Sequence, residues 1–243
     1  MSVLTVPAAI TSQQASVASP LLTDLLLWAE NYSQGTWADS HSSGNDLTMI
    51  GTVADDGAGS AVYGSSTSNY HASTSNDALR TISTSSFSFS LVVTVTSSST
   101  FSNSGVVASV YRASGNSRGW FVDFPNNTTA RFLTSENGQS GGSLNIVSVA
   151  TSISLDTEYT VQGYYDSEND QIAIRVNDGA FGVTTGVTVI NTSTSDFRLG
   201  QIADPGNRFI GEIRKVILWG RKLSTIEFDQ VYNGGSPIGY PGP

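Results

Sequence analysis

Residues 197–235 read FRLGQIADPGNRFIGEIRKVILWGRKLSTIEFDQVYNGG, and this stretch decides the fold. It begins with two alternating apolar runs, residues 197–199 and 209–218, which predict two strands separated by a Pro-Gly turn. Ser224, followed three residues later by Glu227, is typical of a capping box and predicts that a helix begins there. Asn233-Gly234 favours a left-handed helix end. The stretch therefore predicts strand, turn, strand and one short C-terminal helix.

Alternating apolar residues recur through the rest of the chain. Residues 86–96 (SFSFSLVVTVT) place apolar side chains at every second position of a long strand. Residues 159–165 and 172–176 alternate in the same way around a turn at residues 166–170, which predicts a hairpin. Shorter strands are expected at residues 25–29, 47–53, 106–111, 119–124, 130–134 and 144–149. About a dozen strands and one helix predict two antiparallel sheets packed face to face.

The composition suits one large β domain and narrows the function classes. Of the 243 residues, 38% are hydrophobic, so the chain can bury a sizeable core. A formal net charge of −9 argues against nucleic-acid binding, because contacts to phosphates need a basic surface. The absence of cysteine removes disulfides, thiolate metal sites and cysteine nucleophiles. No run approaches the ~20 apolar residues that span a bilayer, and no signal peptide is recognised at the N-terminus.

Two segments flank the predicted sandwich, which is expected to span residues 21–235. Residues 1–20 are small and polar with two prolines, and they predict an extended N-terminal arm that either frays or docks on a partner subunit. Residues 236–243 (SPIGYPGP) are too rich in Pro and Gly for regular structure, and they predict a flexible C-terminal tail.

Four short motifs lie along the chain. They are the hairpin that ends in Asn-Asp-Gly at residues 177–179, F-x-G-x-I at 209–213, L-S-x-x-E at 223–227, and the loop DSHSSGNDL at 39–47. Together they resemble the laminin-G-like domains of the concanavalin A-like lectin/glucanase superfamily, of the type found in phage structural proteins. The resemblance covers residues 22–235 and implies an all-β, two-sheet antiparallel jelly-roll sandwich. Arg214 stands where the family commonly has Asp, and Gly220 where it often has Asn.

Calcium is an option that the resemblance implies, because such domains often hold one ion at the rim of the sandwich with Asp and carbonyl oxygens. Hard oxygen ligands are plentiful at residues 39–46 and 166–170. Neither loop has the spacing of an EF-hand, so no metal ligands are assigned and no other cofactor is expected.

No catalytic residues are assigned. Related glucanases carry an E-x-D-x-x-E run that places two carboxylates on one strand face, and this sequence has no such run. The acidic clusters at residues 55–56 and 166–170 have the composition of turns. His41 and His71 are expected in solvated loops, and a Ser-His-Asp site assembled from distant segments is left open.

Aromatic residues beside polar loops are the candidates for carbohydrate binding, since sugars stack on exposed rings and bond to nearby amides. These candidates are Trp37, Tyr63, Tyr70 and Trp120. The alternative is that half or more of them belong to the core, and Trp120 opens an alternating run that is compatible with inward packing.

Basic residues are concentrated near the C-terminus, where six of the eleven fall between residues 198 and 222. This segment is either an ordinary polar face or a surface that docks on another subunit. The docking candidates are Arg214, Lys215, Arg221 and Lys222.

A lectin-like sandwich with no cysteine, no recognised signal peptide and an extended N-terminal arm favours a non-catalytic virion surface protein of a bacteriophage. Such a protein would be made in the host cytoplasm and serve as a capsid decoration, head fibre or tail component. Its expected partners are major capsid or tail subunits, further copies of itself, for which trimers are typical, and glycans of the cell surface or host envelope. A bacterial glycan-binding lectin or adhesin is the alternative, and a polysaccharide-degrading enzyme is the third hypothesis. Fold alone does not give function, so all three depend on the binding site.

Overall fold

Two antiparallel sheets form the body of the molecule in the computed structural model, which describes residues 20–33, 35–41, 44–66, 68–73, 77–102, 104–139, 144–204 and 206–240. Within these residues each sheet has eight strands. Sheet A has the order β14 (Gly182–Thr185), β13 (Gln171–Val176), β12 (Glu158–Asp166), β7 (Phe87–Val95), β16 (Gly211–Trp219), β5 (Ala61–Tyr63) and β4 (Ala54–Asp55), and β1 (Leu25–Glu30) also pairs with β16. Sheet B has the order β11 (Leu144–Ala150), β10 (Thr129–Ser135), β9 (Arg118–Asn126), β8 (Gly105–Tyr111), β15 (Arg198–Leu199), β6 (Tyr70–Ala72), β3 (Leu47–Ile50) and β2 (Thr36–Trp37). The predicted two-sheet sandwich is confirmed.

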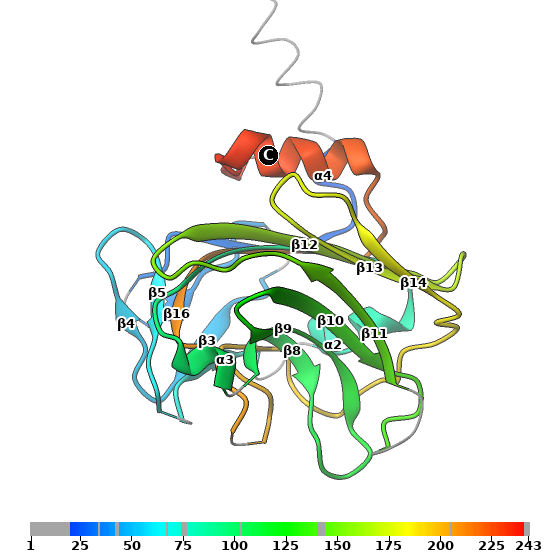
Figure 1. The fold of residues 1–243 in the computed structure, drawn as a ribbon, viewed down its shortest axis with the longest axis horizontal. Helices are drawn as coiled ribbons and strands as arrows, with labels where there is room; N and C mark the ends of the chain where they lie inside the picture. Colours follow the sequence, from blue (N-terminus) through cyan, green and yellow to red (C-terminus); the bar gives the residue numbers. More distant parts are fainter. Residues whose placement is uncertain are drawn as a thin grey trace, which may run out of the picture.

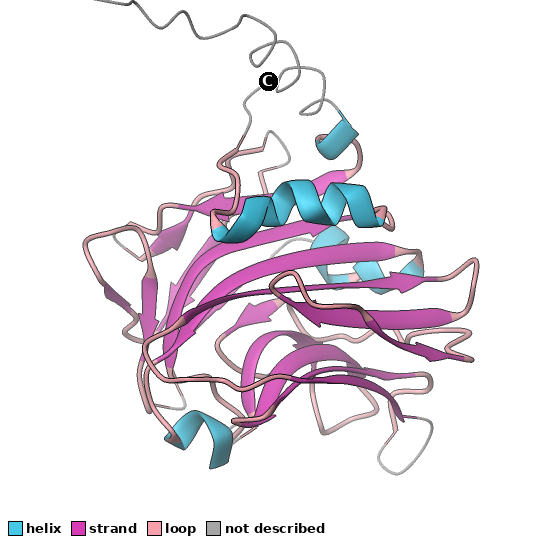
Figure 2. Cartoon of the chain, turned by 45° about the horizontal axis from the view of Figure 1, so that its top comes forward, coloured by secondary structure: helices cyan, strands magenta, loops and turns pink. Residues whose placement is uncertain are grey.

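The predicted C-terminal helix is α4 (Thr225–Tyr232), and its capping box is present. The Ser224 hydroxyl accepts the backbone N–H of Glu227 at 3.3 Å, and the Glu227 carboxylate accepts that of Ser224 at 2.8 Å. Asn233 then ends the helix with a left-handed φ of 47°. Figures 1 and 2 show α4 across the outer face of sheet A, on the side away from sheet B. The remaining helical turns of the described residues are α2 (Asp77–Arg80), η1 (Ile82–Thr84), α3 (Ser99–Ser102) and η2 (Asn233–Gly235), and none of these helices is long and apolar enough to cross a membrane.

The main core lies between the two sheets. Every second residue of β7 points into it, as the alternation predicts, and so do the apolar positions of the β12–β13 hairpin. Phe89 stacks nearly parallel to Trp120 from the opposite sheet, with ring centroids 6.3 Å apart. Gly163 in β12 makes room for this packing, because a Cβ atom there would lie 2.4 Å from the Phe89 ring.

One irregularity in β16 sets which of its residues face the core. Ile213 faces inward, and a register shift against β7 between Ile213 and Lys215 moves the inward positions to Val216 and Leu218. A β-bulge inserts one residue in this way and reverses the alternation that follows it. Trp219 therefore falls on the outer face of sheet A, beneath α4.

A second apolar layer covers the outer face of sheet A. It is built of Leu21, Leu25, Trp28, Tyr164, Ala173, Ile217, Trp219, Leu223, Phe228 and Val231. Arg175 joins this layer to α4, since its guanidinium lies 4.8 Å from the Phe181 ring and donates to Gln162 Oε1 at 2.9 Å and Asp229 Oδ1 at 2.8 Å. The sandwich therefore has three layers: α4, sheet A and sheet B.

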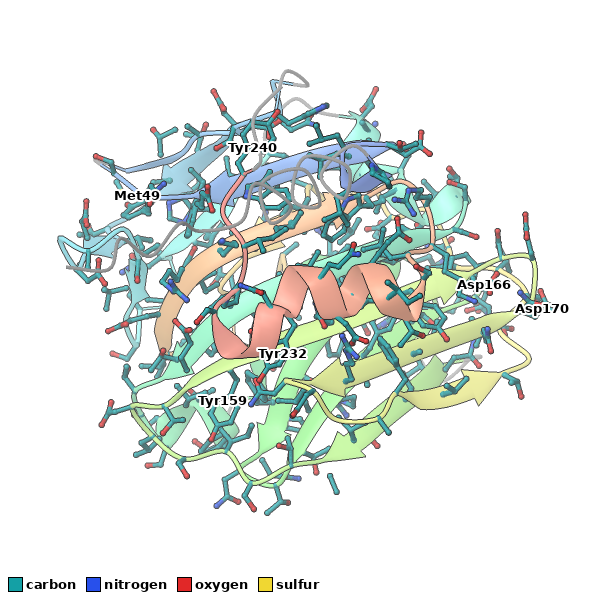
Figure 3. The ribbon with its side chains drawn as sticks, turned by 90° about the horizontal axis from the view of Figure 1, so that it is seen from above. Met49, Tyr159, Asp166, Asp170, Tyr232 and Tyr240 are labelled. Atoms are coloured by element: carbon teal, nitrogen blue, oxygen red, sulfur yellow. The ribbon has the colours of Figure 1, made fainter. Side chains whose placement is uncertain are left out.

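Residues 236–240, the C-terminal strap, pack on the same face as α4. The Tyr240 ring lies 5.7 Å from that of Trp28, and Glu30 accepts the Tyr240 N–H at 2.9 Å. Lys215 donates to the carbonyl of Pro237 at 3.3 Å and pairs with Glu30 at 2.9 Å. The sequence predicts a flexible tail here, but these contacts hold the strap against sheet A (Figure 3). Residues 241–243 of that tail, and residues 1–19 of the predicted arm, lie outside the described residues.

Candidate functional site

The outer face of sheet B is the candidate binding surface. In β9 and β10, Trp120, Val122 and Phe132 point into the core, so the alternating positions Phe121 and Asp123 point outward. The same alternation places further outward side chains on the neighbouring strands: Tyr70, Ser109, Tyr111, Arg131, Leu133 and Arg198. Whereas α4 covers the outer face of sheet A, this face carries the loops at residues 112–117 and 200–209 (Figure 1).

An apolar cluster forms the floor of this face. Tyr111 meets Phe121 edge to face, with ring centroids 4.9 Å apart. Val106, Leu133 and Ile202 complete the cluster, whose side chains are almost fully buried. Burial raises the pKa of the Tyr111 hydroxyl, and the positive charge of the neighbouring arginines opposes that shift. The phenol therefore stays neutral.

A buried ion pair crosses the same face from β9 to β10. Arg131 donates to Asp123 from Nε at 2.9 Å and from its terminal nitrogen at 2.5 Å, and the Asp123 side chain is completely buried. Burial raises the pKa of Asp123, while the two hydrogen bonds from Arg131 oppose that shift. The guanidinium also lies 5.7 Å from the Phe121 ring. Because both oxygens of Asp123 are occupied, this carboxylate is a positioning group rather than an acid or base.

Three of the four aromatic residues predicted to bind carbohydrate lie in the core. Trp37 and Trp120 are 0% exposed and Tyr63 is 1% exposed, all pointing between the sheets. A ligand at the surface does not reach these rings, so the sugar platform predicted from Trp37, Tyr63 and Trp120 is wrong. Tyr70 is different: it lies half-buried on the outer face of sheet B, with the Arg198 guanidinium 4.3 Å from its ring centre.

His71 is not in a solvated loop as predicted. It lies in β6, is 0% exposed and packs edge-on against Tyr32, Tyr63 and Trp37. Burial lowers its pKa to about 3, so the ring is neutral at physiological pH. His41 lies in the loop that follows Asp39, where its ring is 6.5 Å from that of Tyr240.

The four predicted docking residues all pair with acids of their own chain. Arg214 pairs with Glu158 at 2.7 Å, Lys215 with Glu30 at 2.9 Å, Arg221 with Glu227 at 2.6 Å and Lys222 with Asp166 at 2.6 Å. Lys215 is also buried beneath the C-terminal strap. Much of the positive charge in this segment is therefore neutralised within the fold.

The two loops considered for calcium use their carboxylates internally. Asp39 accepts the backbone N–H groups of Trp28, His41 and Asn45 at 3.0–3.1 Å and so fixes the conformation of its loop. Asp166 accepts from Lys222 and from the side chains of the turn that it begins. Although burial raises the pKa of Asp166, these hydrogen bonds lower it to well below its usual range. The described residues contain no group of three or more His, Asp or Glu side chains able to hold a metal.

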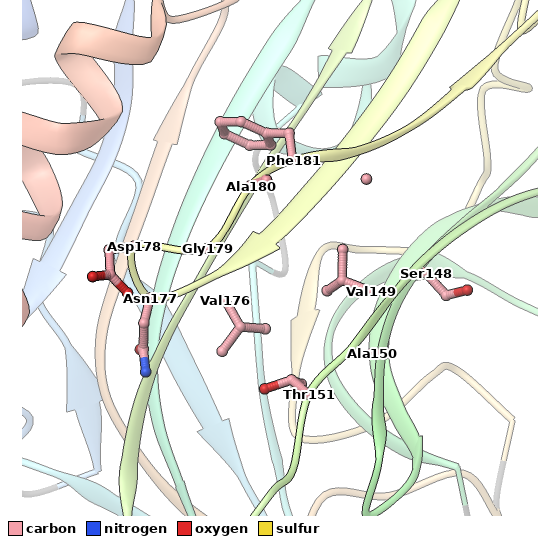
Figure 4. Close-up of a pocket in the computed structure, with 11 residues that line it drawn as sticks. Ser148, Val149, Ala150, Thr151, Val176, Asn177, Asp178, Gly179, Ala180 and Phe181 are labelled. Atoms are coloured by element: carbon pink, nitrogen blue, oxygen red, sulfur yellow. The ribbon is translucent and has the colours of Figure 1, made fainter.

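An open groove of about 570 Å³ runs along one edge of the sandwich, between β11 and the turn after β13. Val149 and Val176 line it from the two sheets, and Asn177, Asp178 and Phe181 border it (Figure 4). Its walls are mostly backbone and small side chains, and it lacks the convergent polar groups of a small-molecule site. We therefore interpret the groove as the gap between the edges of the two sheets and not as a ligand-binding site.

Comparison with known proteins supports the architecture. No family model matches the chain, and no curated protein matches it. Among solved structures it is similar to the receptor-binding domain of botulinum neurotoxin type G, with a TM-score of 0.65, 18% identity, and coverage of 87% of this chain and 51% of that chain. It is also similar to the binding domain of botulinum neurotoxin DC in complex with SialylT (TM-score 0.64, 15% identity, 88% and 52% covered) and to that of serotype C1 (TM-score 0.65, 16% identity, 88% and 52% covered). The chain spans about half the length of these neighbours, one described as a receptor-binding domain and two as binding domains.

Apart from Tyr70, the outward residues of sheet B were not among the sequence candidates. One signal was present: in the run Trp120–Phe124, WFVDF, the large apolar Phe121 alternates with the inward Trp120 and Val122, which indicates that the outer face of the strand is also partly covered. Arg198 gave a second signal. It is a single charged residue between the inward Phe197 and Leu199, which indicates that its side chain points outward.

Proposed function

We propose that this chain is a non-catalytic binding module whose outer sheet B face recognises a glycan of a cell surface or host envelope. The observation that carries the proposal is the contrast between the two outer faces. Sheet A is closed by α4 and the C-terminal strap, whereas sheet B presents the half-buried side chains of Tyr70, Arg131 and Arg198 on its outer face. Aromatic rings beside fixed charged and amide groups are the usual components of sugar recognition.

The fold supports a recognition role, since its solved neighbours are described as receptor-binding or binding domains. The chain also enters and leaves the described fold on the side of sheet A: Arg221 binds the carbonyl of Pro20 at 2.8 Å, and Tyr240 packs on Trp28. Attachment to a carrier through either end would leave the outer face of sheet B directed away from it.

The carrier that we propose is a virion, with the module serving as a capsid decoration, head fibre or tail component of a bacteriophage. A chain without cysteine needs no oxidising compartment to fold, which suits assembly in a host cytoplasm. Major capsid or tail subunits and further copies of the chain would be its partners.

Two experiments test these parts separately. The purified full chain is applied to an array of bacterial and animal glycans, and binding without release of reducing sugar is expected. Absence of binding to every glycan, or cleavage of a bound polysaccharide, would overturn the recognition role. Mass spectrometry and immunogold labelling of purified particles should find the chain on the virion surface, and particles that lack it would overturn the virion assignment alone.

A further inference from the structure

Four arginines of this acidic protein form no ion pair with an acid among the described residues. Of the eleven basic residues, seven form ion pairs within the described structure. The remaining four are Arg112, Arg118, Arg198 and Arg208. With twenty acidic residues in the chain, partners are plentiful elsewhere. Guanidinium groups that no acid neutralises create a positive field that attracts anions where they lie close together.

Backbone pairing places Arg198 on the outer face of sheet B, and the other three arginines lie in or beside the loops that join strands of the same sheet. Arg198 in β15 is opposite Ser109 of β8, Arg112 follows β8, and Arg118 begins β9. Arg208 is bridged to Gln201 in the loop after β15. The carboxylate of Asp204, in that loop, accepts hydrogen bonds from the N–H of Ala113 and, at 3.1 Å, from the Ser114 hydroxyl.

Arg198, Gln201 and Arg208 form a tight corner that we call the arginine corner. Gly200, with a φ of 89°, turns the chain between Arg198 and Gln201, and a side chain there would meet the Tyr63 ring at 2.4 Å. The Phe209 N–H donates to the Gly200 carbonyl at 2.8 Å, and the Ser109 hydroxyl donates to that of Gln201 at 2.9 Å. The corner is therefore fixed by backbone hydrogen bonds before any ligand arrives.

Buried polar atoms at the arginine corner have no partner among the described residues. They are the Nε of Arg198, the Nε of Arg208 and the Oε1 of Gln201. Gln201 is only 3% exposed. A buried donor or acceptor left without a partner is energetically unfavourable. The Arg198 guanidinium lies over the Tyr70 ring, 4.3 Å from its centroid, and this contact restricts the side chain.

These three atoms require two kinds of group from a ligand. The two Nε–H donors need an acceptor, and an oxyanion satisfies guanidinium donors best. The Gln201 oxygen is an acceptor and needs a hydroxyl or amide donor. An inorganic anion supplies only the first, whereas an acidic saccharide supplies both. The Tyr70 ring, beside Arg198, offers a surface against which the sugar can pack.

We propose that the arginine corner, with Tyr70, is the subsite for the carboxylate or sulfate group of an acidic saccharide, bound with a neighbouring hydroxyl on Gln201. This inference rests on the proposed glycan-binding function and names the class of glycan. Arg112 and Arg118 lie at the two ends of the β8–β9 connection in the same sheet and would attract further acidic units of a polymer.

The test compares matched polymers with and without charge: polygalacturonate against its full methyl ester, and dextran sulfate against dextran. Calorimetry on the full chain should show binding of one or both charged polymers and at least tenfold weaker binding of its neutral match. Preference for polygalacturonate would identify a carboxylate and preference for dextran sulfate a sulfate. Equal binding of charged and neutral polymers would overturn the inference.

Matched variants locate the site. Arg198→Met and Arg208→Met should each weaken binding of the charged polymer at least tenfold and reduce its salt dependence. Arg214→Met removes the same charge from the outer face of sheet A and should leave binding unchanged, and thermal unfolding confirms that all three variants fold. Wild-type binding by Arg198→Met and Arg208→Met, or an equal loss in Arg214→Met, would overturn the assignment.

A separate measurement distinguishes this inference from the glycan-binding proposal. Inorganic sulfate at millimolar concentration is titrated while the side-chain Nε–H signals of Arg198 and Arg208 are followed by NMR. Shifts of these two signals without binding of any saccharide would retain the anion subsite and overturn the glycan role. Absence of shifts, together with no preference for charged polymers, would overturn the subsite.

Discussion

The Tyr63 hydroxyl lies 2.7 Å from Nδ1 of His71, in the core between the two sheets. Burial lowers the pKa of His71 to about 3 and raises that of Tyr63 well above its usual value. Both groups are therefore neutral, and they share one hydrogen bond whose donor is set by the tautomer of His71. The other ring nitrogen of His71 has no partner among the described residues.

This burial predicts a loss of stability in mild acid. Between the unfolded pKa of about 6.5 and the folded value, the unfolded chain binds the proton that native His71 excludes, so stability falls as pH falls. From pH 7 to pH 5 the free energy of unfolding should drop by about 2 kcal/mol through this residue. Urea unfolding at the two pH values measures it. His71→Gln should remove that part of the pH dependence, and an unchanged slope would contradict the prediction.

Gly163→Ala should strongly destabilise the sandwich. The added methyl group would meet the Phe89 ring at 2.4 Å and the Ala173 carbonyl at 2.5 Å, in the middle of the core. Overpacking of this kind costs about 1–3 kcal/mol, and thermal unfolding measures it. Gly64→Ala is the matched control, because a Cβ atom at Gly64 meets nothing within 4 Å. Equal melting temperatures for the two variants would refute this account of Gly163.

Arg175→Met should loosen α4 from sheet A. The substitution leaves buried Gln162 without its donor and removes the cation from the Phe181 ring, at a cost of about 2 kcal/mol or more. Limited proteolysis should cut within α4 sooner, and urea unfolding gives the energy. Asp229→Asn tests the exposed end of the same contact and should cost less than about 1 kcal/mol, because the Asp229 side chain is 61% exposed. A larger loss in Asp229→Asn than in Arg175→Met would contradict this.

Asp166→Asn should destabilise the β12–β13 hairpin. The Asp166 carboxylate is 3% exposed and bonds Lys222 at 2.6 Å and Asn169 at 2.8 Å, and the loss of its charge should cost about 1–3 kcal/mol. Since its folded pKa is lowered, this contribution is present at neutral pH and is lost on acidification below the ordinary carboxyl range. Asp170→Asn, four residues along the same turn (Figure 3), should have little effect because its left-handed φ of 53° suits Asn equally well. Chemical unfolding at pH 7 compares the two.

The parts of the fold that the sequence predicts are those with long, local signals. β7, the β12–β13 hairpin and α4 each carry several periods of alternation or a complete cap, and each lies where the pattern places it. β2, β5 and β6 are two or three residues long, too short for an alternation to be read. Trp37, Tyr63 and His71 lie on these strands, so their burial follows from pairing with distant strands rather than from their neighbours in sequence.

The candidate site could not be predicted from the sequence, because its residues are also brought together by contacts between separate segments. Arg198, Gln201 and Arg208 are scattered among Gly and Pro, and only the bridge between Gln201 and Arg208 brings them together. The partners that neutralise the predicted docking residues are equally remote, with Glu158 and Glu30 far from Arg214 and Lys215 in the sequence. Charge density along a chain therefore overstates the charge that a folded surface presents.

The bulge in β16 affects how sequences of this architecture should be compared. Ile213 and Val216 both face the core although they are three positions apart, because the register shift between Ile213 and Lys215 absorbs one residue. A related chain that lacks the extra residue would keep the same core but need a single-residue gap at this point. An ungapped comparison would match core positions to surface positions from there to Trp219, so similarity would be lost along a strand whose three-dimensional structure is shared.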